Sequence, residues 1–230
     1  MEYILEGIWK ALRLIFSLDS EIFSIALLSL KVSTTATILS SLIGAPVGFI
    51  IGTSEFWGKK VLITIFNTFM AFPTVVVGLL VYSFISRQGP LGPLGLLFTP
   101  TAMVIGQFIL ATPIIIAFTV SATQGIDPRV KLTAMTLGAG PLRRAITILS
   151  EARFALMAAV TAGFGRVIAE VGCALMVGGN IKGYTRTMTT AISLETSKGE
   201  FAFGLALGFI LLAVAFFVNI LLHWLQSRRP

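Results

Sequence analysis

Five long apolar runs dominate the chain, each near or above the roughly 20 residues that a helix needs to cross a bilayer. They occupy residues 22–53, 61–86, 101–121, 154–177 and 201–224. A segment in lipid must satisfy its own backbone hydrogen bonds, so helices are the structure that these runs can adopt. The pattern predicts an all-α fold, a polytopic membrane helix bundle with about five transmembrane helices in a single domain over residues 1–230.

Composition argues against a soluble globular protein. Of the 230 residues, 56% are hydrophobic and 12% are charged, whereas a soluble domain carries about 25% charged residues. A chain of this size has too little core volume to hide so much apolar surface from water. The formal net charge is +7. Its basic residues lie between the apolar runs rather than along one stripe, so they indicate membrane topology and no nucleic-acid partner.

The N-terminal segment, residues 2–17, has charged residues on one helical face and apolar residues on the other. Glu2, Glu6, Lys10 and Arg13 recur at spacings of four, four and three residues. This pattern predicts an amphipathic helix that lies in the membrane interface, in contact with lipid. The alternative is a shortened first span, which four charges would interrupt.

Basic residues in the connections set the expected orientation. With five spans, nine Lys and Arg residues fall on one side and four on the other, and the richer side is expected to be cytoplasmic. The N-terminus is then outside and the C-terminus inside the cell (inner) membrane. The richer side holds Lys59, Lys60, Arg129, Lys131, Arg143, Arg144, Arg153, Arg228 and Arg229, and the other holds Arg87, Lys182, Arg186 and Lys198.

The loop at residues 127–153 carries helix signals of its own. Asp127 is a good N-cap and Pro128 a good first helical residue, while Gly138 suits the left-handed position that ends a helix. Pro141 can start a second short helix. Because a loop of this length with its own structure usually has a function, we expect it to dock on a cytoplasmic partner. The alternative is a solvated basic connector.

Two groups of polar residues within the apolar runs are candidates for a translocation path. Arg166 and Glu170 are four residues apart, so they should share a helical face and point into the bundle or a water-filled path. They form either a structural ion pair or a contact to substrate. Lys31, Thr34 and Thr35 of the first run could line a polar path. Alternatively, the hydroxyls bond to their own helix and Lys31 reaches a headgroup.

The loop resembles the EAA signature of membrane permeases in ABC importers. Leu132, Thr133 and Ala134 stand at the EAA positions and Gly138 at the glycine, but the acidic residue is missing and Glu151 replaces the final proline. The resemblance implies that residues 127–153 form the coupling helix, seated on an ATP-hydrolysing subunit. The implied contact residues are Leu132, Thr133, Ala134, Leu137, Gly138, Ala139, Arg143 and Arg144.

The stretches EVGCALMVGGN and TRTMTTAISLET resemble the tungstate-specific branch of these permeases most closely. Molybdate and sulfate permeases carry a related Arg-x-x-x-Glu-x-Gly arrangement and remain alternatives. The resemblance implies a permease subunit of a binding-protein-dependent importer that works as a homodimer. Its partners would be two cytoplasmic ATPase subunits and an extracytoplasmic oxyanion-binding protein.

The chain has no Gly-rich phosphate loop followed by Lys-Ser or Lys-Thr, so ATP and Mg are expected on the partner ATPase and no cofactor on this chain. With one cysteine and one histidine, no metal site is expected, and we expect a non-catalytic subunit. Two readings from other classes are a secondary transporter, driven by an ion gradient, and an intramembrane enzyme. The enzyme would need more ionisable residues within the membrane than Arg166, Glu170 and Lys31.

Overall fold

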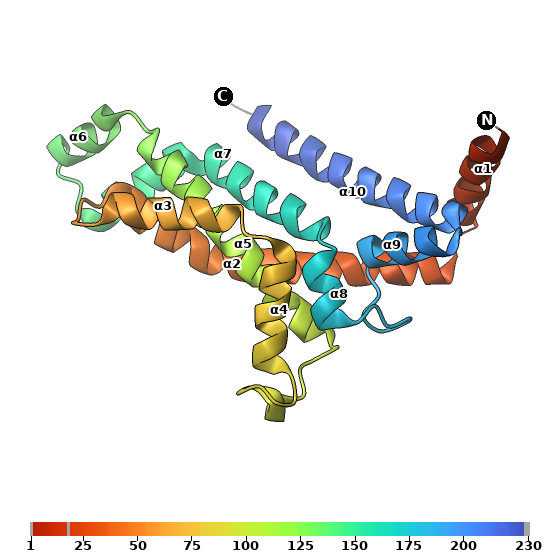
Figure 1. Ribbon diagram of the computed structural model, residues 1–230. Coiled ribbons are helices and arrows are strands. Elements are labelled where there is room, and N and C mark those ends of the chain that lie inside the picture. Colours follow the sequence, from red (N-terminus) through yellow and green to blue (C-terminus); the bar gives the residue numbers. More distant parts are fainter. Residues whose placement is uncertain (1, 18, 228–230) are drawn as a thin grey trace.

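The computed structural model describes residues 2–17 and 19–227, and within these ranges its regular structure is entirely helical. The predicted all-α class is therefore confirmed, and the basic pair Arg228 and Arg229 lies outside the described residues. In chain order (Figure 1) the helices are α1 (Glu2–Phe16), α2 (Ser20–Thr53), α3 (Lys59–Met70), α4 (Thr74–Ile85), the short 3-10 helix η1 (Gly92–Leu94), α5 (Pro100–Gln124), α6 (Pro128–Thr136), α7 (Pro141–Ile168), α8 (Gly172–Gly178), α9 (Met188–Lys198) and α10 (Phe201–Ser227).

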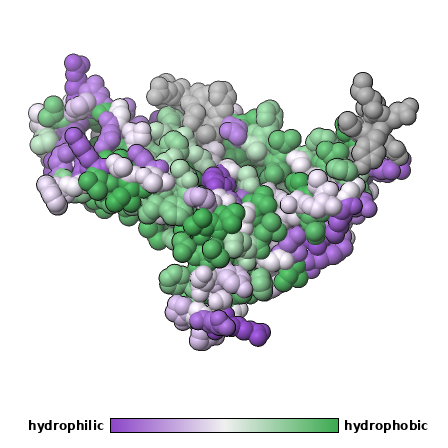
Figure 2. Space-filling view, in the orientation of Figure 1, coloured by the Kyte–Doolittle hydropathy of each residue, from purple (hydrophilic) through white to green (hydrophobic). Residues whose placement is uncertain are grey.

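Four of these helices, α2, α5, α7 and α10, are long and apolar enough to cross a membrane. Helices α3 and α4 together pass the same test but meet at an angle of 96°, so the described chain has five candidate spans if this pair counts as one. Figure 2 shows hydrophilic residues at the end that carries α6 and at the opposite end, with hydrophobic surface between them. We call these the α6 end and the α9 end. The predicted membrane bundle is confirmed.

The second apolar run, residues 61–86, forms two helices rather than one continuous helix. Helix α3 ends at Met70 and α4 begins at Thr74. Pro73 explains the break, because proline has no N–H to donate and disfavours helical backbone in the residue before it. Since composition stays apolar through the break, hydropathy alone does not reveal the bend.

The fourth run also differs from its expected form, residues 154–177. Helix α7 begins at Pro141 and ends at Ile168, and the separate helix α8 follows. The second helix of the 127–153 loop is therefore not short, as expected, but is the first part of α7. No proline follows Pro141 before residue 168, so the helix continues, although charged residues delay the apolar run until residue 154.

Helices α2 and α5 pack closely along a ridge of three glycines spaced four residues apart. A Cβ atom at Gly48 would lie 2.7 Å from the Ile116 carbonyl oxygen, and one at Gly44 would lie 3.1 Å from the Ile115 side chain. Gly52 faces Thr123 in the same way. The absence of side chains on these glycines therefore lets the two helices approach closely.

Helix α1 packs on α10. The Ala11 side chain is fully buried, and Leu14 and Ile15 pack against the same apolar cluster, which includes Ile22 and Leu207. The amphipathic helix is therefore present where it was expected, and its position at the membrane interface remains a prediction.

Candidate coupling surface and translocation path

Helix α6 begins and ends as the sequence predicts. The Asp127 carboxylate accepts a hydrogen bond of 2.8 Å from the backbone N–H of Arg129, which caps the first turn. Gly138 lies in the left-handed region with a φ of 74°, and the Ala139 N–H donates to the Ala134 carbonyl at 2.9 Å. The chain then reverses into α7. The N-cap and the helix-ending glycine are both confirmed.

The reversal between α6 and α7 exposes large apolar side chains at a hydrophilic end of the molecule. Leu137 is 81% exposed, Leu142 75% and Leu132 59%, while Ala134 is buried where α6 meets α7. We call residues 128–144 the α6 corner. Several large, exposed apolar side chains within one short segment are typical of a surface that another protein covers.

The remaining predicted coupling residues lie on the same corner. Thr133, Gly138 and Arg143 are exposed, whereas Ala139 and Arg144 are half-buried. The Arg144 Nε atom is buried and has no hydrogen-bond partner among the described residues. The fold thus gathers the predicted coupling residues on one surface, with apolar and cationic groups side by side.

Arg166 and Glu170 form the expected ion pair, but across the end of a helix. The Arg166 Nη1 atom lies 2.8 Å from Glu170 Oε2, and α7 ends at Ile168, two residues before Glu170. The second carboxylate oxygen of Glu170 accepts a hydrogen bond of 2.9 Å from the N–H of Cys173 in the first turn of α8. One buried carboxylate therefore joins the last turn of α7 to the first turn of α8.

The backbone around Glu170 is fixed as well. The Thr189 hydroxyl donates to the Glu170 carbonyl at 2.7 Å, and the Met188 N–H donates to Ser29 Oγ at 2.8 Å. Glu170 is 3% exposed, whereas the Arg166 side chain is 35% exposed. Glu170 is thus a structural anchor in this fold, and Arg166 is the more exposed member of the pair.

The polar residues of α2 are arranged differently from Arg166 and Glu170. Lys31, Thr34 and Thr35 are exposed along a face that they share with Leu27 and Ile38. The Thr35 hydroxyl donates to the Lys31 carbonyl of its own helix at 2.7 Å. No hydrogen bond or ion pair in the described residues joins this group to Arg166 or Glu170. For Thr35 the structure favours the alternative that the sequence left open, in which the hydroxyl bonds to its own helix.

A network of charges at the α9 end was not foreseen from the sequence. The Glu21 carboxylate lies 2.8 Å from Lys182 and 3.8 Å from Arg186, and Arg186 lies 3.6 Å from Glu195. Lys198 approaches Glu195 at 3.1 Å. The side chains of Arg186 and Glu195 are each 11% exposed. Loss of an ion-pair partner would therefore leave a largely buried charge less well compensated. Because Glu21 and Glu195 are 174 positions apart, sequence spacing carries no signal for this network.

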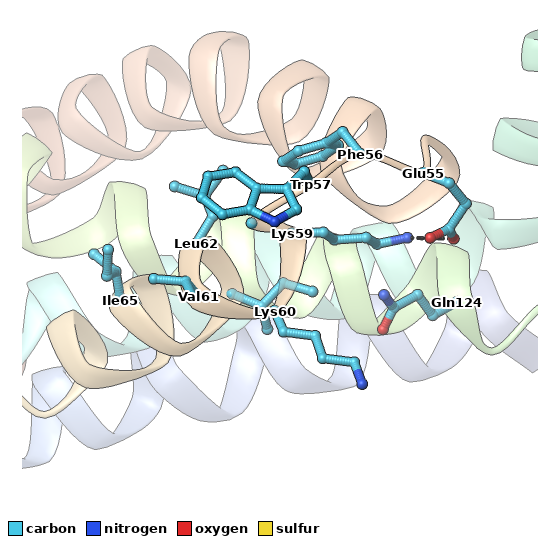
Figure 3. Close-up of a pocket in the computed structure, with 11 residues that line it drawn as sticks. Glu55, Phe56, Trp57, Lys59, Lys60, Val61, Leu62, Ile65 and Gln124 are labelled. Atoms are coloured by element: carbon cyan, nitrogen blue, oxygen red, sulfur yellow. Dashed lines mark hydrogen bonds and ion pairs between the residues drawn. The ribbon is translucent and has the colours of Figure 1, made fainter.

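A groove of about 990 Å³ opens at the α6 end, where α3 begins (Figure 3). Lys59 binds the Glu55 carboxylate at 2.9 Å and the Gly52 carbonyl at 3.2 Å. The hydrogen bond from Lys59, followed by its charge, lowers the pKa of the Glu55 carboxyl. Lys60 points away from this pair (Figure 3), and its ammonium has no ion-pair partner among the described residues.

Comparison with known proteins places this geometry in a family. Residues 44–229 match the family described as binding-protein-dependent transport system inner membrane component. The tungstate uptake system permease protein TupB of Campylobacter jejuni is 46% identical over 226 residues, covering 98% of this chain and 95% of that protein. TupB of Peptoclostridium acidaminophilum is 40% identical over 228 residues, covering 99% of this chain and 100% of that protein.

A solved structure shares the fold. The MetNI methionine ABC transporter in an inward-facing conformation gives a TM-score of 0.70 at 15% identity, covering 93% of this chain and 96% of that chain. At this identity the match concerns the helix arrangement alone. The family match and the two relatives decide the assignment: the chain belongs to the inner membrane components of binding-protein-dependent transport systems.

Proposed function

We propose that the chain is the membrane-spanning permease subunit of an ATP-driven ABC importer that translocates tungstate. The observation that carries the proposal is 40–46% identity to two tungstate uptake permeases over nearly the whole chain. Molybdate and sulfate, which are also tetrahedral dianions, are the alternative substrates. Such ions favour hydroxyl and N–H donors in a positive potential.

The α6 corner is the surface on which the ATPase subunit docks. Its exposed leucines, Leu132, Leu137 and Leu142, offer apolar surface to a groove of the ATPase subunit. Arg143, also exposed, adds a positive charge to this corner. The two ATPase subunits bind ATP and Mg, and this chain contributes no catalytic group. Two copies of the chain form a homodimer around a central path, with one α6 corner for each ATPase subunit.

The α9 end faces outward and receives a binding protein that delivers the oxyanion. The α6 end is then cytoplasmic, with the N-terminus outside and the C-terminus inside. Single cysteines placed at Arg143 and Lys198 in a Cys173→Ala background test this orientation by labelling from outside intact cells. Position 198 should label and position 143 should not. The reverse pattern would contradict the orientation, and equal labelling would contradict the five-span topology.

Arg166 supplies positive charge to the path, and Glu170 holds its guanidinium in place. The support is the difference in burial, since Arg166 is 35% exposed and Glu170 is linked to α8 and α9 by hydrogen bonds. Lys31, Thr34 and Thr35 remain candidates for the path, although their apolar neighbours fit a face in contact with lipid.

The proposal is tested by uptake into proteoliposomes that contain this chain, its ATPase subunit and the binding protein. ATP-dependent uptake should be fastest with tungstate, slower with molybdate and small with sulfate. Strong transport of sulfate, or of an amino acid, would contradict the tungstate assignment. Uptake driven by an ion gradient without the ATPase would identify a secondary transporter, and turnover of a compound by the purified chain would identify an enzyme.

A further inference from the structure

Helix α3 has three distinct faces. Leu62, Ile63 and Phe66 pack against a cluster formed by α2 and α5. A second face is apolar and exposed, with Val61 64%, Ile65 42% and Phe69 44% exposed. The third face is polar and exposed, and the spacing of its members places them on one side of the helix. We call it the polar face of α3, and it consists of Lys60, Thr64, Asn67 and Thr68.

The polar face lies at membrane depth rather than in the solvated end. Helix α3 packs against Ile116 and Val120 in the second half of α5, a helix apolar enough to span a membrane. Its 12 residues extend from the groove at the α6 end to the bend before Pro73. With the orientation proposed above, this face runs through the cytoplasmic half of the membrane, a length of roughly 18 Å at 1.5 Å per residue.

Hydrocarbon is a poor environment for this face. The hydroxyls of Thr64 and Thr68 donate to the Lys60 and Thr64 carbonyls at 2.9 and 2.8 Å, so these two side chains are satisfied within the helix. The exposed Asn67 amide has no hydrogen-bond partner among the described residues. A polar group in lipid must be paired or must face a water-filled cavity. Contact with lipid would therefore be unfavourable for Asn67.

The charge of this face suits an anion. It contains no carboxylate, and the acidic residue close to its cytoplasmic end, Glu55, is already paired with Lys59 at 2.9 Å. Lys60 has no ion-pair partner in the described chain, so it places a positive charge at the end of this face that lies nearest the α6 end (Figure 3). We call this end of the polar face the mouth. The Asn67 amide further in offers N–H donors, which are the groups that a tetrahedral oxyanion accepts from.

We propose that the polar face of α3 lines the cytoplasmic half of the anion path, with Asn67 and Lys60 contacting the oxyanion as it leaves. This inference rests on the proposed function, because it assumes an anion and the stated orientation. If a second copy of this chain packed on the same face, the face would be dry. The hydration of the face in the assembled complex therefore tests the inference directly.

The test uses single cysteines in the Cys173→Ala background, with the complete complex in proteoliposomes. Positions 64, 67 and 68 sample the polar face, and positions 61, 65 and 69 sample the apolar face of the same helix at matched depth. Because a charged thiol reagent reacts with the hydrated thiolate, the polar-face cysteines should react at least about tenfold faster. Their modification should also stop transport, whereas modification of the apolar face should not. Equal reactivity of the two faces would overturn the proposal.

A second measurement addresses the charge at the mouth. Lys60→Gln should lower ATP-dependent oxyanion uptake by about fivefold or more while leaving complex assembly intact, and Lys60→Arg should restore it. Uptake unchanged in Lys60→Gln would overturn the role of Lys60. Failure of the proposed function looks different: fast, face-specific labelling with uptake of sulfate instead of tungstate would keep the path and reject the tungstate assignment.

Discussion

The α9 end and the α6 corner are built in opposite ways. At the α9 end, Thr185 and Thr189 are buried and donate to the Gly178 and Glu170 carbonyls, and Glu195 is enclosed by two cations. At the α6 corner, Leu137 and Leu142 are among the more exposed large apolar side chains. One region holds buried hydroxyls and charges in internal hydrogen bonds and ion pairs, whereas the other exposes apolar surface.

Because of this difference, substitutions in the two regions should damage different properties. A change at the α9 end removes partners from buried groups, so it should act on the stability of the chain itself. A change of an exposed side chain at the α6 corner should leave the isolated chain intact and act on the complex, whereas a change that strains its backbone should affect both. The predictions below test this division in decreasing order of their effect on the isolated chain.

Substitution of the Glu170 anchor should have the largest effect. Glu170→Ala removes the partner of Arg166 and the acceptor of the Cys173 N–H, and it should lower the stability of the detergent-solubilised chain by about 3 kcal/mol. Glu170→Gln keeps an acceptor and should be milder. Thermal unfolding measures both variants, and a Glu170→Ala chain as stable as wild type would contradict the anchor role.

Pairing Glu170→Gln with Arg166→Met separates structure from transport. The double variant removes both charges, so it should recover much of the stability lost on removing a single partner. If stability recovers while uptake stays lost, Arg166 also acts on the anion. Recovery of both properties would restrict the pair to a structural role.

Substitution of Gly138 should have the next largest effect on the isolated chain, because it strains the backbone of the α6 corner. Gly138→Val forces a β-branched residue to a φ of 74°, a strain of roughly 1–2 kcal/mol, although no atom lies within 4 Å of the added Cβ. We expect loss of ATPase co-purification and of uptake. Gly140→Val is the matched control, because Gly140 is equally open but has a φ of −66°. Similar behaviour of the two variants would contradict the backbone argument.

The ion network at the α9 end should contribute less to the stability of the isolated chain than Glu170 or Gly138 does. Arg186→Ala leaves Glu195 with Lys198 as its remaining partner and should destabilise the chain by about 1 kcal/mol. Lys182→Ala is the control, since Lys182 is 67% exposed and such pairs contribute little. Chemical denaturation in detergent compares the two, and a larger loss for Lys182→Ala would reverse the expected order.

Leu137→Ser should have the smallest effect on the isolated chain, within about 0.5 kcal/mol of wild type, because the side chain is already exposed. Its effect on the complex should be large, with affinity for the ATPase subunit reduced about tenfold or more. Leu94→Ser provides a control with 63% exposure on η1. Equal affinities for the two variants would remove Leu137 from the docking surface.

The parts of the fold that the sequence predicts well are those with a local cause. The Asp127 cap and the left-handed Gly138 depend on residues within a few positions, and both are present. The Arg166–Glu170 pair also follows from spacing, although it spans the end of α7.

Features that depend on distant residues were missed. Pro73 is a local cause of the break between α3 and α4, but the sequence carries no sign of the 96° angle between the two helices. The hydroxyl of Thr189 meets the Glu170 carbonyl 19 positions away, and the Met188 N–H meets Ser29 across 159 positions. Such partners are set by helix packing, which cannot be read from local patterns in a single sequence. The polar face of α3 was also missed, because its exposure depends on how the other faces of the helix pack.

The uninterrupted course of α7 gives the molecule a rigid lever. Its 28 residues join the α6 corner directly to the turn that carries Glu170, with no proline after Pro141 to act as a joint. At 1.5 Å per residue the lever is about 42 Å long, so a tilt of about 10° about the α6 corner would move its far end through about 7 Å. If an ATPase subunit docks on the α6 corner as proposed, a small rotation of that subunit would move the far end of α7, near Arg166, by more than the diameter of a water molecule.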